Sequence, residues 1–204
     1  MSILEILRIF IVFLPAVILH ECAHGWVANK LGDSTAKLAG RLTLNPLKHI
    51  DPIGTVMLPA LLFLFQSPVL FGWAKPVPVN FRNLRHPKRD MIWVGMAGPA
   101  INIILAIVLS LLLKLNISST AYDLITTAVL VNLVLAIFNL IPIPPLDGSR
   151  LVMGLLPSRF ALLYSRLENY GIIIVFLLLS FGLLNHVVWP IVVYLAHFLG
   201  TKVI

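Results

Sequence analysis

Several apolar runs in this chain approach or exceed the length that a helix needs to cross a lipid bilayer. A transmembrane helix requires about 20 mostly apolar residues, and the run from Met91 to Lys114 meets that requirement. Hydrophobic residues make up 59% of the 204 residues and charged residues only 11%, against roughly 45–50% and 25% in typical globular proteins. The sequence therefore predicts an integral membrane protein.

The order of these runs predicts an all-α polytopic membrane protein with about five to six transmembrane helices in a single domain, residues 1–204. The first helix is expected from Ile3 to about Lys30, with Gly32 as its stop signal. The stretch GRLTLN alternates like a strand, which predicts a short β element near the site discussed below. Later spanning segments are expected at 91–114, 124–141 and 171–200, the last divided near Pro190.

The segment 53–71 is apolar, but it is short and is interrupted by Pro59 and Pro68. If it crossed the membrane, the basic stretches on its two sides would face opposite compartments. Because cytoplasmic loops collect Lys and Arg, we predict instead a re-entrant hairpin that leaves both basic stretches in the cytoplasm. This orientation puts the amino terminus outside the cytoplasm and residues 20–24 near the cytoplasmic side of a multi-pass plasma-membrane protein.

The same topology accounts for the formal net charge of +7. The basic residues flank apolar runs and form no separate basic domain, so no nucleic-acid partner is expected. The chain has one cysteine, Cys22, which excludes an intrachain disulfide.

One charged motif stands at the end of the first apolar run, where ionisable groups are costly and usually mark function. His20, Glu21 and His24 form the pattern H-E-x-x-H. Residues i and i+4 share a helical face, so both imidazoles can reach one metal ion. Glu21 lies beside them and could take a proton from a water bound there, whose pKa zinc lowers towards about 7. The motif is typical of a zinc protease site.

A catalytic zinc ion uses three protein ligands and one open position. Asp147 is the carboxylate best placed to be the third, because it follows the broken end of an apolar run, FNLIPIPPLDGSR, whereas the other free carboxylates lie in or near polar stretches. The prolines prevent a regular helix there. An N-cap role for Asp147 in the next helix explains the pattern equally well, and spacing alone leaves the two open.

The other donors compete weakly for a metal ion. Cys22 lies two residues from His20 and should point away from the histidine face. His49 and His86 are predicted to be solvated in basic loops, and His186 and His197 to lie at the membrane surface.

Three motifs, HECAH, AGPAIN and FNLIPIPPLDG, occur in this order on separate apolar segments. In this respect the chain resembles the site-2 protease family (peptidase M50) of intramembrane zinc metalloproteases, and in particular compact prokaryotic members without PDZ or CBS domains. The resemblance covers about residues 6–156, which would form the catalytic core, with further helices at about 170–200.

The resemblance implies one Zn²⁺ per chain, held by His20, His24 and Asp147, with Glu21 as the general base. It also implies that Asn102 and Asn139 lie near the site, where an amide could contact the substrate backbone or the developing oxyanion. The alternative for both asparagines is hydrogen bonding between helices.

The implied reaction is hydrolysis of peptide bonds within or near transmembrane segments of membrane protein substrates, in contact with the lipid bilayer. Two other classes stay open. A membrane metal-binding or transport protein would need a polar path across the bilayer, and a catalytically idle scaffold would not need Glu21 between the two histidines.

Overall fold

The computed structural model describes residues 3–65 and 72–201, and within these residues every regular element is helical. The longer elements and their short connecting helices are α1 (Ile3–Lys30), α2 (Thr35–Leu38), η1 (Pro46–Lys48), η2 (Pro52–Met57), α3 (Leu58–Leu64), η3 (Phe81–Asn83), α4 (Pro87–Leu112), α5 (Ser119–Asn139), α6 (Gly148–Leu155), α7 (Ser158–Ser165), η4 (Arg166–Tyr170), α8 (Gly171–Ser180), η5 (Leu184–Val188) and α9 (Trp189–Phe198).

Within the described part of the chain, four helical stretches are long and apolar enough to cross a membrane: Arg8–Lys30, Pro87–Leu112, Ser119–Asn139 and Ser158–Ser180. Two shorter apolar helices, Pro52–Leu64 and Leu184–Phe198, accompany them. Many large apolar side chains face outwards, whereas the polar side chains of His20, His24 and Asn102 are buried. Val108 and Phe176, for example, are 51% and 68% exposed, the reverse of the pattern in a soluble protein. The predicted all-α polytopic architecture is confirmed.

The predicted short β element is not found. Residues 40–45, GRLTLN, form turns and bends, and no strand occurs among the described residues. Local groups replace a strand partner here: the Asn45 side chain accepts a hydrogen bond from Leu47 N, 3.1 Å, and His49 Nε2 donates to Thr43 O, 2.8 Å. The prediction for His49 was also wrong, since its side chain is fully buried beneath this loop.

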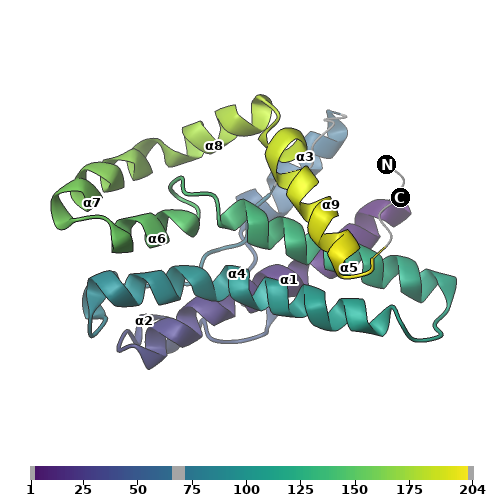
Figure 1. The fold of residues 1–204 in the computed structure, drawn as a ribbon, viewed down its shortest axis with the longest axis horizontal. Helices are drawn as coiled ribbons and strands as arrows, with labels where there is room; N and C mark the ends of the chain where they lie inside the picture. Colours follow the sequence, from purple (N-terminus) through teal and green to yellow (C-terminus); the bar gives the residue numbers. More distant parts are fainter. Residues whose placement is uncertain (1–2, 66–71, 202–204) are drawn as a thin grey trace.

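The helices that carry the HECAH, AGPAIN and LDG motifs pack directly on one another. α1 and α4 lie side by side, α5 packs against both, and α6 packs against α4 (Figure 1). Helix α9 packs against α5. The buried core at this contact consists of Ala106, Val129, Leu133, Val188, Val192 and Ala196. The small and β-branched residues in this core let the helices approach closely, as is usual where lipid offers no competing hydrophobic effect.

The segment after η1 begins with a short apolar helix. Pro52–Leu64 has 13 residues, about 20 Å of helix, which is too short for the roughly 30 Å hydrocarbon core. Residues 66–71 of the predicted return arm lie outside the described residues. The chain then comes back beside its own start, because Trp73 N donates to Gly54 O at 3.1 Å.

The first helix ends at Lys30, as the sequence predicts, and is followed by Gly32, whose φ of 116° is unfavourable for other residues. The next residue, Asp33, is fully buried and accepts hydrogen bonds from Asn80 N at 2.7 Å, Asn83 Nδ2 at 3.0 Å and Thr35 N at 3.1 Å. Burial by itself raises the pKa of Asp33, but these hydrogen bonds outweigh it and lower the pKa below its ordinary value. Asp33 therefore fixes the end of α1 to the segment before α4.

We expect this contact to make stability depend on pH in the acid range. A carboxyl whose pKa is depressed in the folded protein contributes stability above its unfolded pKa, about 3.9, and loses it as pH falls through the lower folded pKa. Thermal unfolding in detergent between pH 6 and pH 3 should show Asp33→Asn less stable than wild type at pH 6, with the gap narrowing below about pH 4. Asp123→Asn, at an exposed carboxylate, is the matched control. A gap that stayed constant to pH 3 would refute this account.

Candidate metal centre

Three potential metal ligands meet inside the helix bundle. His20 and His24 lie one turn apart on α1, and their Nε2 atoms are 3.0 Å from each other. Asp147 enters from the turn between α5 and α6, and its Oδ2 lies 3.0 Å from His20 Nε2 and 3.2 Å from His24 Nε2. In the part of the chain that the structure describes, this is the one group of three or more His, Cys, Asp or Glu side chains close enough to share a metal ion.

Hydrogen bonds on the far side of each imidazole fix which nitrogen carries the proton. His20 Nδ1 faces Asn102 Oδ1 at 2.6 Å, and His24 Nδ1 faces Val94 O at 2.6 Å. Both partners are acceptors, so each Nδ1 is the donor and each neutral ring presents the lone pair of Nε2 to the centre. Such partners commonly hold metal-ligating histidines in orientation.

With both histidines neutral, this arrangement brings together three electron-pair donors with no hydrogen between them. Asp147 Oδ2 is buried and has no hydrogen-bond donor among the described residues, and the two Nε2 atoms cannot donate to it while both histidines are neutral. A bound cation would satisfy all three atoms at once. Two imidazole nitrogens and one carboxylate oxygen are a donor set that fits zinc with an open fourth position.

The turn before α6 determines where the Asp147 carboxylate points. Asp147 occupies the N-cap position of α6 but makes no capping hydrogen bond, and its side chain is directed at the two histidines instead. Gly148 allows this, because a Cβ there would lie 2.5 Å from Ile141 O and overlap Leu140 O. The close packing of this turn against the end of α5 therefore depends on a residue without a side chain.

Gly98 of α4 forms the opposite wall of the centre. A Cβ at this position would lie 2.5 Å from both Cε1 and Nε2 of His20 and would overlap His24 Nε2. In the sequence this glycine is part of the AGPAIN motif. Its position shows that the missing side chain leaves open the space in front of both Nε2 atoms.

The two predicted asparagines lie in different environments. Asn102 is fully buried: its Oδ1 accepts from His20, and its Nδ2 donates to Asn132 Oδ1 at 2.7 Å and to Ala16 O at 3.3 Å. Asn139 instead donates to Leu135 O of its own helix at 2.9 Å. Asn132 was not singled out from the sequence, because Asn102 and Asn139 were chosen from the family resemblance; a polar amide in the middle of the apolar run 124–141 is a signal that could have marked it.

The other side chains that could bind a metal ion do not belong to this group of three. Glu21 accepts a hydrogen bond from Val77 N at its Oε2, 2.7 Å. Cys22 Sγ donates to Thr43 O at 3.2 Å and so faces the 40–45 loop. Of the other histidines, His49 is buried under that loop, whereas His86, His186 and His197 are exposed.

The sequence model of peptidase family M50 matches residues 115–182, a range that includes Asp147. No solved structure matches the chain.

Curated relatives cover much more of it. YwhC of Bacillus subtilis, which is named a zinc metalloprotease, is 41% identical over 182 residues, or 84% of this chain and 80% of the relative. Rip2 of Mycolicibacterium smegmatis, also named a zinc metalloprotease, is 28% identical over 93% of this chain and 73% of its own length. The zinc metalloprotease MJ0392 of Methanocaldococcus jannaschii is 29% identical over 95% of this chain but only 48% of its own length. The chain therefore belongs to peptidase family M50, the site-2 protease family of zinc metalloproteases.

Proposed function

We propose that this protein is an intramembrane zinc metalloprotease that hydrolyses peptide bonds within or near transmembrane segments of membrane protein substrates. One observation carries the proposal: the ligand atoms of His20, His24 and Asp147 all lie within 4.8 Å of one another, on and beside helices apolar enough to span a membrane. A metalloprotease centre at that depth is suited to substrates that are themselves in the bilayer.

In this proposal His20, His24 and Asp147 hold one Zn²⁺ per chain. When bound, zinc supplies Lewis-acid polarisation of a carbonyl and lowers the pKa of water. Asn102 orients His20, because both ends of its amide are already engaged within the protein. This assignment replaces the predicted contact of Asn102 with the oxyanion, while a substrate contact by Asn139 stays a prediction.

Glu21 is the proposed general base. It adjoins His20 in the chain, and its carboxylate takes the proton of the attacking water and passes it to the leaving amine nitrogen. The substrate must unwind locally first, because the scissile carbonyl of a helix is engaged in an i to i+4 hydrogen bond.

Topology supports a site near the cytoplasmic face of a plasma membrane. His20 and His24 lie in the second half of α1, and the basic segments 30–50 and 72–90 follow that end of the helix. Retention of these segments in the cytoplasm places the amino terminus outside. We assign all 204 residues to one catalytic domain, because α1, α4 and the α5–α6 turn all contribute to the centre and α9 packs on α5.

The direct test is cleavage of single-pass transmembrane substrates by the purified protein in liposomes. Glu21→Gln should lower the cleavage rate by at least about 100-fold, since general acid–base catalysis contributes about 10²–10⁴-fold, and it should keep the zinc content of the wild type. Zinc transport into the liposomes that survives this substitution would instead indicate a metal transporter. Full proteolysis by the variant would refute the role of Glu21.

A further inference from the structure

A short non-helical segment passes beside Glu21 of α1. We call residues 73–80, WAKPVPVN, the strap. It contains no helix, and it is fixed by hydrogen bonds from Lys75 N to His49 O at 2.9 Å and from Asn80 N to Asp33 Oδ2 at 2.7 Å, in addition to the bond from Trp73 to Gly54. The strap is therefore anchored at both ends and in its first half.

Within the strap, one backbone N–H is set apart by the sequence. Pro76 and Pro78 have no N–H, so Val77 carries the one amide hydrogen of this tripeptide. Pro78 also restricts Val77 to extended backbone. The Val77 N–H donates to Glu21 Oε2 at 2.7 Å, and the Val77 side chain is 7% exposed.

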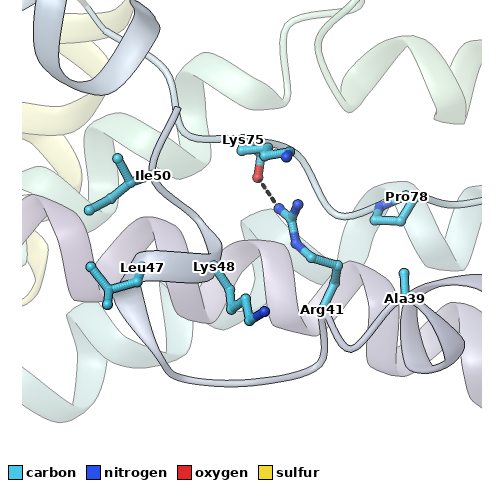
Figure 2. A pocket seen from close by; sticks show the side chains of 7 residues that line it. All are labelled: Ala39, Arg41, Leu47, Lys48, Ile50, Lys75 and Pro78. Atoms are coloured by element: carbon cyan, nitrogen blue, oxygen red, sulfur yellow. Dashed lines mark hydrogen bonds between the residues drawn. The ribbon is translucent and has the colours of Figure 1, made fainter. Parts of the chain in front are cut away.

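The same peptide group is held from its other side by a buried cation. Arg41 is 9% exposed, and its Nη2 donates to Pro76 O at 3.2 Å and to Lys75 O at 2.7 Å. Figure 2 shows the Arg41 side chain reaching the Lys75 carbonyl at the edge of an open cavity of about 380 Å³. Pro76 C=O and Val77 N–H belong to one planar peptide unit and point in opposite directions. This unit therefore joins the Arg41 guanidinium to the Glu21 carboxylate.

We propose that the Pro76–Val77 peptide, held by Arg41, is the positioning group for Glu21; this inference rests on the proposed protease function. The hydrogen bond occupies Oε2, so that Oε1 is left to exchange the proton. A hydrogen bond to a charged group is stronger than a neutral one, and a neighbouring guanidinium polarises the peptide further. Glu21 is thereby held in one orientation before substrate binds.

Two substitutions at Val77 separate its N–H from its side chain. Val77→Pro removes the N–H and keeps apolar bulk, in a segment where prolines already flank the residue. Val77→Ala keeps the N–H and removes the packing. With the full chain in liposomes, Val77→Pro should lower kcat by about 10- to 100-fold, the effect of losing a hydrogen bond to a charged group, with KM and zinc content unchanged. Val77→Ala should stay within about 3-fold of wild type. Equal kcat values for the two variants would overturn the proposal.

A second measurement does not depend on proteolysis or on the folding of the proline variant. Amide hydrogen exchange of the strap, in zinc-loaded full-length protein, should be at least about 10-fold faster in Glu21→Ala than in wild type. Glu21→Gln keeps an acceptor oxygen and should stay close to wild type. Unchanged exchange in Glu21→Ala would show that the contact does not hold the strap and would overturn the inference. If exchange is faster in Glu21→Ala as expected but the wild-type protein cleaves no transmembrane substrate, the proposed function and the role of Glu21 as base are both overturned. The contact between Glu21 and the strap would then still stand.

Discussion

Asp147→Ala is expected to lose the zinc that the wild-type protein retains through purification, and with it all measurable proteolysis. The substitution removes one of the three proposed ligands and leaves two imidazole Nε2 atoms 3.0 Å apart with no carboxylate to balance a cation. Elemental analysis of the protein in detergent should give about one zinc per chain for wild type and close to none for the variant, as expected for a site with three protein ligands.

Two comparison variants make this result specific. Asp123→Ala removes an exposed carboxylate of α5 and should keep its zinc. Asn102→Leu removes the hydrogen-bond partner of His20 Nδ1 and should weaken zinc binding by about 10- to 100-fold without abolishing it. If Asp147→Ala binds zinc as tightly as wild type, the third ligand lies elsewhere and the geometry described above does not represent the metal-bound centre.

Gly98→Ala should be nearly as damaging as loss of a ligand, although it adds only one methyl group. That methyl group would lie 2.5 Å from His20 Nε2, in the space that the proposed metal ion and a reacting carbonyl would share. Either α4 moves away from α1 or the imidazoles rotate, and a shift of about 1 Å at a catalytic centre costs about 100-fold in rate. We expect kcat/KM to fall by that factor or more, together with reduced zinc content.

The control is a glycine-to-alanine change at a site without neighbours. At Gly40, which has φ of 63°, no atom lies within 4 Å of an added Cβ. Gly40→Ala should therefore lower thermal stability by roughly 1–2 kcal/mol through backbone strain alone and leave zinc content unchanged. If Gly98→Ala keeps full zinc content and activity, the space in front of the histidines is not needed for the reaction.

The helical class and the position of the metal motif follow directly from the sequence. Apolar runs of about 20 residues leave few alternatives to a helix in lipid, because every backbone N–H and C=O must be satisfied within the segment. His20 and His24 share a face of α1 by helical periodicity alone. Gly32, which adopts a positive φ that favours glycine, follows the end of that helix. These features depend on local rules, which a sequence carries in full.

The strand predicted for residues 40–45 failed for the converse reason. Alternation of polar and apolar residues predicts a strand only where a partner backbone is available, and here side chains such as Asn45 and the buried His49 take up the hydrogen bonds instead. The burial of His49 depends on how the loop folds over it, and that is a matter of tertiary packing.

The sequence by itself thus determined a polytopic helical protein with two histidines and a glutamate at the end of its first helix. Only the tertiary structure decided that Asp147 turns towards those histidines rather than capping α6, that Gly98 opens the space in front of them, and that Asn102 and Asn132 stand behind His20. It also brought Val77 to Glu21, which is 56 residues away in the chain. Contacts between side chains on different helices depend on the packing of α1 against α4 and α5, and no local pattern encodes that packing.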